Sequence, residues 1–121
     1  MTTLVLAEDD LDIRAIAARI LRRAGYEVIE AADGSEALEA VREHRPGVVV
    51  SDIDMPVMSG VDLCLALRAD PATADLPVIF VSGSLVPGDP RPEQAQATAV
   101  LPKPFLPREL VDCVEEALSR R

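Results

Sequence analysis

Four short apolar runs constrain the fold of this chain more than any other feature of its sequence. They are residues 4–7, 48–50, 78–81 and 100–101, and polar residues follow each of them. Continuous aliphatic runs of this length are typical of strands that are buried on both faces of a parallel sheet. Residues 26–31 add a fifth segment that is rich in strand-forming residues.

The segments between these runs have the patterns of helices. Asp33 followed by Glu36 resembles a capping box, which marks the start of a helix. Another helix is expected over residues 60–69, and a last one near the end of the sequence, where Arg120 and Arg121 would complement the negative end of the helix dipole. The side chains predicted to face the sheet from residues 60–69 are Val61, Cys64, Leu65 and Leu67.

The region between the predicted fourth and fifth strands is unfavourable for a full helix. Residues 87–92 contain three prolines and one glycine, and prolines inside a helix remove hydrogen-bond donors and clash with the preceding turn. Only residues 92–97 remain compatible with a helix. The sequence therefore predicts a short or partly disordered fourth helix.

Five strands that alternate with five helical segments predict an α/β fold. Such a chain forms a doubly wound parallel sheet with right-handed crossovers. The two common strand orders are the longer Rossmann order and the flavodoxin-like order 2-1-3-4-5, and five strands favour the second. The 121 residues fit one domain, which we assign to residues 1–121.

The composition narrows the class of partner. The chain has 12 Lys plus Arg against 21 Asp plus Glu, and its net charge of −9 repels nucleic-acid backbones and anionic lipid. No apolar stretch approaches the roughly 20 residues that span a bilayer, and residues 1–4 lack the features of a signal peptide. Cys64 and Cys113 lack the spacing of a metal or redox pair, which predicts buried reduced thiols. We expect a cytoplasmic protein that binds neither nucleic acid nor membranes directly.

Side chains of different chemistry follow the apolar runs. Glu8 and Asp9 follow the first predicted strand, Asp52 follows the third, Ser82 ends the fourth, and Lys103 follows the fifth. Ligands of open parallel sheets bind outside the carboxyl ends of the strands. We therefore expect these carboxylates, this hydroxyl and this ammonium group to meet at one edge of the sheet.

This combination predicts a phosphate and metal site. Carboxylates held close together repel one another unless a hard cation lies between them, and Mg²⁺ suits a site with few protein ligands and substrate oxygens. An aspartate such as Asp52 can attack phosphorus when nearby cations neutralise the transferring group. Lys103 can supply one such cation, and the Ser82 hydroxyl can donate to a phosphoryl oxygen.

Each of these residues also has a plainer interpretation. Glu8, Asp9 and Asp10 could act only as acids and caps at the start of a helix. Asp52 could be an ordinary loop acid, Ser82 a turn former and Lys103 a solvated charge. Their joint placement at the strand ends favours the phosphate site.

Four segments resemble the receiver domain of bacterial two-component response regulators. These are LVLAEDD at residues 4–10, SDIDMPVMSG at 51–60, FVS at 80–82 and LPKPF at 101–105. The resemblance covers essentially the whole chain, and the family also has the strand order 2-1-3-4-5.

The resemblance implies a role for each candidate residue. Asp52 would be the phosphoacceptor and Lys103 its cationic partner, while Ser82 would be the switch hydroxyl that turns inward when phosphate arrives. Glu8 and Asp9 would form the acid pair, with Asp9 binding Mg²⁺ directly and Glu8 acting mostly through a water. Asp52 and the main-chain carbonyl of Asp54 would complete the metal shell, which could also take Mn²⁺. The Lys103–Pro104 peptide bond would be cis.

The resemblance also implies a function as a phosphorylation-dependent signalling switch. The phosphoryl group would come from a sensor histidine kinase or a histidine phosphotransfer protein, and the output would pass to a downstream protein target. We expect a monomer or a weak phosphorylation-dependent dimer. Chemistry would be limited to self-directed phosphoryl transfer and slow self-dephosphorylation, so we do not expect an enzyme with external substrates.

Three features depart from the family pattern. Val100 stands where relatives usually have Tyr or Phe, and Gly83 where they usually have alanine. The proline-rich stretch within residues 86–97 replaces a full fourth helix. These departures predict a non-standard output face without aromatic coupling, although the prolines could instead only tune local stability.

Two other functions compete with the switch. Asp52 and Asp54 resemble the Asp-x-Asp nucleophile motif of haloacid dehalogenase-type phosphatases, but that motif normally follows the first strand and a cap domain should be present. A degenerate receiver that acts as a phosphate-independent interaction module is the other alternative. His44 lies at a predicted helix end, where a solvated histidine is expected instead of a phosphohistidine.

Overall fold

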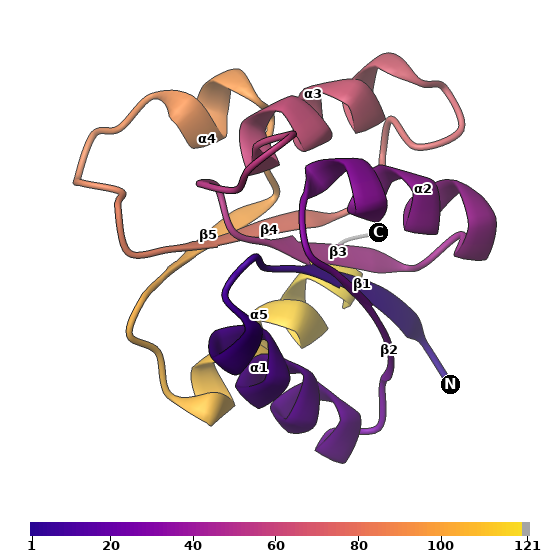
Figure 1. The fold of residues 1–121 in the computed structure, drawn as a ribbon, viewed down its shortest axis with the longest axis vertical. Helices are drawn as coiled ribbons and strands as arrows, with labels where there is room; N and C mark the ends of the chain where they lie inside the picture. The colour runs from indigo at the N-terminus through magenta and orange to yellow at the C-terminus, as the bar shows by residue number, and fades with distance from the viewer. Residues whose placement is uncertain (120–121) are drawn as a thin grey trace.

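The computed structural model describes residues 1–119, and in it a five-stranded parallel sheet has the order β2-β1-β3-β4-β5. This is the predicted flavodoxin-like fold, with strands and helices in strict alternation along the chain (Figure 1). The strands are β1 (Thr3–Ala7), β2 (Glu27–Ala31), β3 (Val48–Ser51), β4 (Val78–Ser82) and β5 (Ala99–Pro102). The helices are α1 (Leu11–Arg23), α2 (Gly34–His44), α3 (Gly60–Ala69), α4 (Arg91–Gln94) and α5 (Pro107–Ser119).

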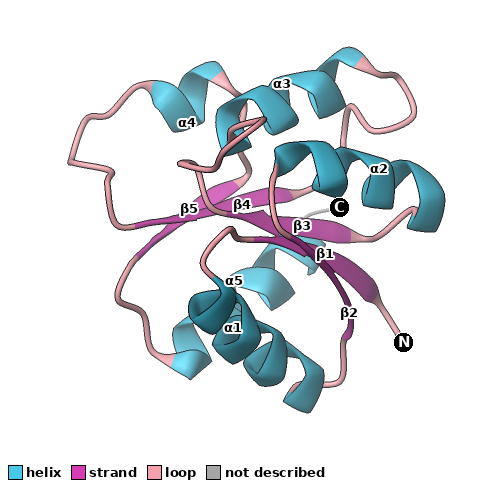
Figure 2. Ribbon diagram, in the orientation of Figure 1, coloured by secondary structure: helices cyan, strands magenta, loops and turns pink. Residues whose placement is uncertain are grey.

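Helices cover both faces of the sheet and form two separate core layers. Figure 2 shows α2, α3 and α4 over one face and α1 and α5 over the other. Because strand side chains alternate between faces, Val5 and Val49 pack toward the first layer while Leu4 and Val50 pack toward the second. Burial on both faces explains why β1, β3 and β4 are continuous apolar runs. The outer strands β2 and β5 are partly exposed, so the run at residues 100–101 does not belong to a strand buried on both faces, contrary to expectation.

Side-chain caps fix where α1 and α2 begin. Asp10 accepts hydrogen bonds from the backbone N–H groups of Asp12 and Ile13 at the start of α1. Asp33 accepts one from Glu36 at 2.9 Å, so the predicted start of α2 is confirmed. Caps of this kind satisfy N–H groups that have no partner within the helix. They also set the direction in which α1 and α2 leave the strands that precede them.

The fourth helix is short, as predicted, but it begins one residue before the expected range. It comprises four residues and none of its side chains is buried. Arg91 is its first residue, and Pro92 is tolerated because the first turn of a helix needs no N–H donor there. The proline-rich stretch therefore shortens the helix without abolishing it.

Other details differ from expectation. Leu65 is 44 % exposed instead of facing the sheet, and Leu63 is fully buried in its place. Cys64 is buried as predicted, whereas Cys113 is only half-buried. The role expected for Arg120 and Arg121 lies outside the described residues.

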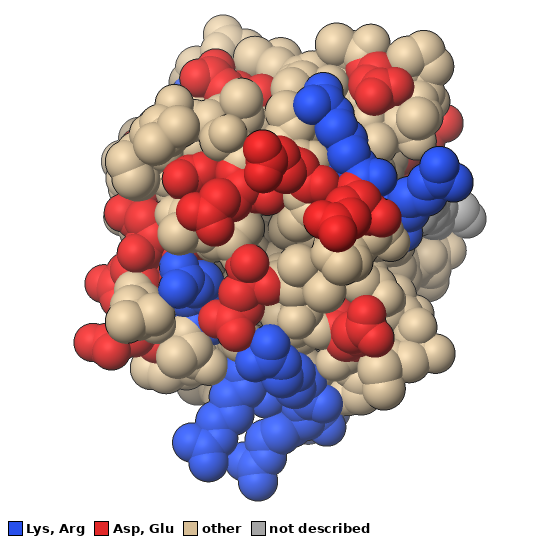
Figure 3. Space-filling model, turned by 45° about the vertical axis from the view of Figure 1, so that its right-hand side comes forward, with Lys and Arg blue, Asp and Glu red and all other residues tan. Residues whose placement is uncertain are grey.

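The surface is predominantly acidic, in keeping with the net charge of −9. Figure 3 shows carboxylates spread over one face and basic side chains gathered at the lower end of the view, where α1 lies. No helix among residues 1–119 has the length and apolar character required to span a bilayer.

Candidate functional site

Three carboxylates converge where β1 and β3 end. Ligand oxygens of Glu8, Asp9 and Asp52 all lie within 4.8 Å of one another. The backbone positions two of these residues firmly. The N–H of Asp52 donates to the carbonyl of Ala7 at 2.9 Å, and the N–H of Glu8 donates to the carbonyl of Ala31 at 3.0 Å. The expected meeting of these acids at one edge of the sheet is therefore what the fold produces.

The adjacent acids Glu8 and Asp9 lie in different environments. Glu8 is 4 % exposed, whereas Asp9 is exposed. The Glu8 Oε1 atom accepts a hydrogen bond from Lys103 at 2.5 Å, but Oε2 is buried without any hydrogen-bond partner. A buried polar atom without a partner is unfavourable unless a ligand or ion satisfies it. Glu8 therefore presents one unsatisfied oxygen within the carboxylate cluster.

Burial changes the protonation of Glu8. It raises the pKa of Glu8 to about 7, because the charged form loses hydration. The hydrogen bond from Lys103 works against this rise, and the carboxylate of Asp52 adds to it. A cation placed among these acids would favour the ionised form of Glu8.

Hydrogen bonds to both carboxylate oxygens orient the side chain of Asp52. Its Oδ1 atom accepts a hydrogen bond from the N–H of Ile53 at 2.7 Å, and Oδ2 accepts one from Lys103 at 3.3 Å. The side chain is 13 % exposed, so the carboxylate is largely withdrawn from water and still reachable. These contacts hold a potential nucleophile in one orientation.

Lys103 reaches the carboxylates from the end of β5. Its backbone N–H donates to the carbonyl of Ser82 at 3.0 Å, which extends the pairing of β4 and β5. The Lys103–Pro104 bond is cis, as the resemblance implied. Burial lowers the pKa of Lys103, but the hydrogen bond with Glu8 and the charge of Asp52 outweigh it, so the pKa lies above the ordinary lysine value. The group is therefore a fixed cation at neutral pH.

Two glycines allow the loop after Asp52 to pack closely. A Cβ atom on Gly60 would lie 2.1 Å from the carbonyl oxygen of Asp52, and one on Gly34 would lie 2.5 Å from the carbonyl oxygen of Met58. Gly34 also donates its N–H to that oxygen at 3.0 Å. Val57, at the tip of this loop, has a φ of 68° and is 85 % exposed. The loop is thus held against α2 and α3 by close backbone approach.

The predicted switch residue Ser82 is the last residue of β4 and is 2 % exposed. Its hydroxyl lies 3.0 Å from the hydroxyl of Ser84. Ser84 in turn donates to the carboxylate of Asp54 at 2.5 Å, and Arg91 of α4 approaches the same carboxylate at 3.5 Å. Sequence reasoning missed this network. It considered only the main-chain carbonyl of Asp54, whose proposed role toward a metal stays a prediction.

The departures from the family pattern are visible on the surface of the fold. Val100 lies on β5 and is 40 % exposed. A Cβ atom on Gly83 would lie 3.7 Å from the side chain of Lys103, which is ordinary contact. His44, the last residue of α2, is exposed, and its Nε2 atom lies 3.9 Å from the carboxylate of Glu43. Its position agrees with a solvated histidine.

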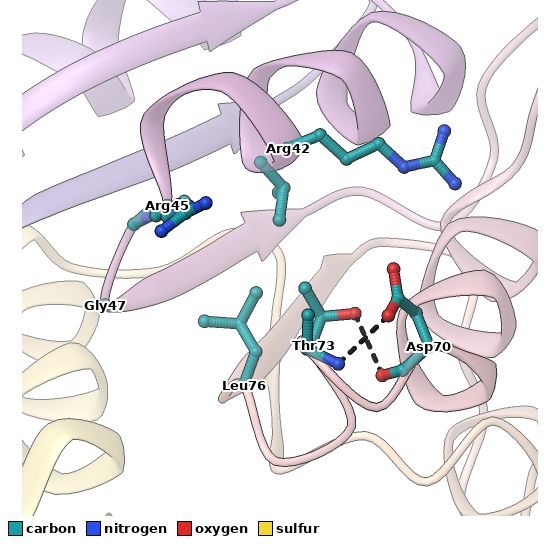
Figure 4. Close-up of a pocket in the computed structure, with 9 residues that line it drawn as sticks. Arg42, Arg45, Gly47, Asp70, Thr73 and Leu76 are labelled. Carbon is teal, nitrogen blue, oxygen red and sulfur yellow. Dashed lines mark hydrogen bonds between the residues drawn. The ribbon is translucent and has the colours of Figure 1, made fainter.

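A separate hollow lies away from the carboxylates, near the ends of α2 and α3. It has a volume of about 520 Å³, and Figure 4 shows its lining between the end of α2 and the loop after α3. Arg42 and Arg45 border it on one side, and Asp70 and Thr73 on the other. The Thr73 hydroxyl is already engaged with the carbonyl of Leu67 at 2.7 Å. No cluster of converging reactive groups lines this hollow, so the carboxylate edge is the better candidate site.

The comparison with known proteins agrees with this geometry. A family model for the response regulator receiver domain matches residues 4–115. Transcriptional regulatory protein PrrA of Mycobacterium tuberculosis is 42 % identical over 118 residues, which cover 97 % of this chain and 50 % of PrrA. The chain thus spans about half the length of the first curated relatives it matches.

Solved structures show the same fold. A putative response regulator from Chloroflexus aurantiacus is 34 % identical, with a TM-score of 0.92 and 98 % of both chains covered. The receiver domain of sensor histidine kinase PA1611 from Pseudomonas aeruginosa, with a magnesium ion coordinated in its active site cleft, is 26 % identical. It has a TM-score of 0.90 and covers 98 % of each chain. The chain described here belongs to the response regulator receiver domain family of two-component signalling.

Proposed function

We propose that this chain is a phosphorylation-dependent signalling switch in which Asp52 accepts a phosphoryl group in a Mg²⁺-dependent reaction. One observation carries the proposal: the ammonium group of Lys103 contacts both Asp52, at 3.3 Å, and Glu8, and oxygens of Asp52, Glu8 and Asp9 lie within 4.8 Å of one another. The carboxylates alone would repel a phosphoryl group. Lys103 supplies one cation that offsets their charge, and their close grouping suits a bound Mg²⁺ as a second.

The residues of the site fit a magnesium ion. Mg²⁺ prefers carboxylate and carbonyl oxygens and retains several waters, so it needs only a few protein ligands. Asp9, which is exposed, and Asp52, whose side chain is 13 % exposed, would supply direct carboxylate ligands, and the main-chain carbonyl of Asp54 would supply a third. The unsatisfied Oε2 of buried Glu8 would accept a hydrogen bond from a water on the ion. Mn²⁺ offers similar chemistry. The magnesium ion in the cleft of the PA1611 receiver supports this assignment.

The chemistry of transfer follows from these positions. An oxygen of Asp52 attacks the phosphorus of a phosphohistidine, and the new O–P bond forms as the P–N bond breaks and the imidazole leaves with the electron pair. Bound Mg²⁺ supplies charge neutralisation for the carboxylate and the phosphoryl oxygens. Lys103 neutralises further charge on the phosphoryl group, and the Ser82 hydroxyl donates a hydrogen bond to one phosphoryl oxygen. Water later hydrolyses the aspartyl phosphate slowly.

The proposed partners follow from the same chemistry. A sensor histidine kinase or a histidine phosphotransfer protein supplies the phosphohistidine, and a downstream protein target reads the phosphorylated state. PrrA is named a transcriptional regulatory protein, and this chain matches about half of its length.

Acetyl phosphate tests the proposal directly. In the presence of Mg²⁺, intact-mass spectrometry should detect one added phosphoryl group on the wild-type chain and none on Asp52→Asn. Asp75→Asn, which alters an exposed acid outside the site, is the matched control and should be labelled like wild type. Addition of EDTA should abolish labelling. Labelling of Asp52→Asn would refute the assignment, and failure to label any variant would favour the phosphate-independent interaction module.

A further inference from the structure

The Ser82 hydroxyl has defined partners before any phosphate arrives. It lies 3.0 Å from the hydroxyl oxygen of Ser84, and it accepts a hydrogen bond from the backbone N–H of Ser84 at 3.1 Å. Ser82 is 2 % exposed, so water offers it little alternative. The state of this hydroxyl therefore depends on Ser84.

The number of hydroxyl protons determines which serine is the donor in the hydrogen bond between Ser82 and Ser84. Ser84 donates to the Oδ2 atom of Asp54 at 2.5 Å, and an ionised carboxylate can only accept. A serine hydroxyl has one proton, so Ser84 has none left for Ser82. Ser82 must therefore be the donor in the bond between the hydroxyls.

This chain of hydrogen bonds continues to the start of α4. Arg91 is the first residue of α4, and its guanidinium group lies 3.5 Å from Asp54 and 3.5 Å from the Ser84 hydroxyl. Asp89 holds the same guanidinium group at 3.0 Å and accepts the backbone N–H of Arg91 at 2.9 Å. Arg91 thereby connects the loop after β4 to the beginning of α4.

The two ends of α4 are anchored differently. At its C-terminal end, the carbonyl of Ala95 accepts a hydrogen bond from the buried thiol of Cys64 at 3.1 Å, and the carbonyl of Gln96 accepts one from Arg68 at 3.0 Å. Ala95 is fully buried against the core. At the N-terminal end, the described contacts are the polar ones made by Arg91. A loss at Arg91 therefore frees one end of the helix while the other stays attached.

We infer that Ser84, Asp54 and Arg91 form a latch that links the Ser82 hydroxyl to α4. The inference rests on the proposed function, because it requires a phosphoryl group on Asp52. The single proton of Ser82 cannot serve both Ser84 and a phosphoryl oxygen. When Ser82 turns toward the phosphoryl group, both hydrogen bonds between Ser82 and Ser84 are lost, the one between the hydroxyls and the one that the Ser84 N–H donates. The loop that carries Ser84 is then no longer tied to the end of β4. Ser84 loses its fixed position against Asp54 and Arg91, and the N-terminal end of α4 loosens.

The latch links phosphorylation to α4 through polar groups, where many receiver domains use an aromatic side chain on β5. Val100 has no ring that could exchange an exposed position for a buried one, whereas the latch crosses from β4 to α4 without using that residue. Arg91 acts as a positioning residue, since it touches neither Asp52 nor the phosphoryl group. Because coupling is reciprocal, loss of the latch must favour occupation of the phosphoryl site.

Beryllofluoride, which mimics a phosphoryl group on aspartate, provides the test. Its affinity is measured by ¹⁹F NMR at saturating Mg²⁺ for wild type, Ser84→Ala, Arg91→Ala and the control Arg108→Ala. Arg108 is a matched exposed arginine, paired with Asp112 on α5 at 3.8 Å. We expect Ser84→Ala and Arg91→Ala to bind about 2- to 5-fold more tightly than wild type, the range that corresponds to an exposed ion pair or one weak hydrogen bond. Arg108→Ala should be unchanged.

The direction of the Arg91→Ala effect is diagnostic. Loss of a cation near the site removes an electrostatic attraction and by itself weakens anion binding, so tighter binding requires the latch. Affinities equal to or weaker than wild type in both Ser84→Ala and Arg91→Ala would overturn the inference.

Hydrogen exchange gives a second, independent readout. The N–H groups of Gln94 and Ala95 donate to Pro90 and Arg91 at 2.9 Å and 3.0 Å. We expect beryllofluoride to accelerate their exchange in wild type, and Arg91→Ala to exchange fast already without it. An identical beryllofluoride response in wild type and Arg91→Ala would also overturn the latch. If wild type shows no bound ¹⁹F signal, the proposed function itself fails, so the two failures are distinguishable.

Discussion

The carboxylate edge and the α4–β5 face are neighbours in the fold, yet they are built in opposite ways. At the edge, the side chains of Glu8, Asp52 and Lys103 are 5 %, 13 % and 19 % exposed, and Glu8 and Asp52 follow β1 and β3, which are buried on both faces. On the α4–β5 face, α4 has four residues and none is buried, and Val100 is 40 % exposed. A rigid edge preserves the geometry of phosphoryl transfer, whereas a weakly held helix responds to small changes in free energy.

The largest expected difference between the two regions is their tolerance of one added methyl group. Gly60→Ala places a Cβ atom 2.1 Å from the Asp52 carbonyl oxygen, so α3 must move away from the edge. We expect a loss of about 3 kcal/mol in the free energy of unfolding, measured by urea denaturation. Gly83→Ala meets its nearest atom at 3.7 Å and should change stability by less than about 1 kcal/mol. Similar losses in both variants would remove the distinction between a rigid and a tolerant region.

The next effect concerns the buried acid at the edge. The pKa of Glu8 is about 7 in the folded protein against an ordinary value of 4.5, so the folded state binds this proton more tightly than the unfolded state. In metal-free protein, the resulting stability is fully present below pH 4.5 and is lost as the pH rises through about 7. It amounts to roughly 3 kcal/mol.

Urea denaturation in EDTA across this pH range measures the effect. Glu8→Gln removes the titrating group, so its free energy of unfolding should fall by less than that of wild type over the same interval. Mg²⁺ should reduce the wild-type loss, because a bound cation favours the ionised carboxylates. Equal pH dependence in wild type and Glu8→Gln would show that Glu8 is not the source.

The smallest effect is expected on the α4–β5 face. Val100→Tyr adds a ring at a position that is already 40 % exposed, and we expect a change in stability within about 0.5 kcal/mol. Phosphorylation by acetyl phosphate should proceed at the wild-type rate. Leu101→Ala, on the same strand at 8 % exposure, is the contrasting control and should lose about 2 kcal/mol or more. A large loss in Val100→Tyr would mean that this face is packed more tightly than its exposure indicates.

The strands and the carboxylate cluster could be predicted because their signals are local. A strand buried on both faces must be apolar throughout. Residues 4–7 and 48–50 can therefore be identified as strands from their own sequence, without knowledge of the strands beside them. Acids that follow such strands must then meet wherever the carboxyl ends meet. The lateral order of the strands is not local, and it depended on strand count and on the family resemblance.

The details that escaped prediction depend on long-range contacts. Helix α3 is apolar around most of its circumference, so periodicity alone could not choose Leu63 over Leu65 as the buried residue. The links from Asp54 to Ser84 and Arg91 join residues 30 and 37 positions apart. Hydrogen bonds over such distances leave no periodic pattern in the sequence, and only the folded arrangement brings their partners together.

The left-handed conformation of Val57 places backbone strain in the loop after Asp52. A β-branched residue with a φ of 68° is unfavourable by roughly 1–2 kcal/mol, and at 85 % exposure the side chain gains little packing in return. The hydrogen bond from Gly34 to Met58 keeps the loop wound. Opening of that bond would release this strain, so the loop that follows Asp52 has less to lose from a change of conformation than an unstrained loop would.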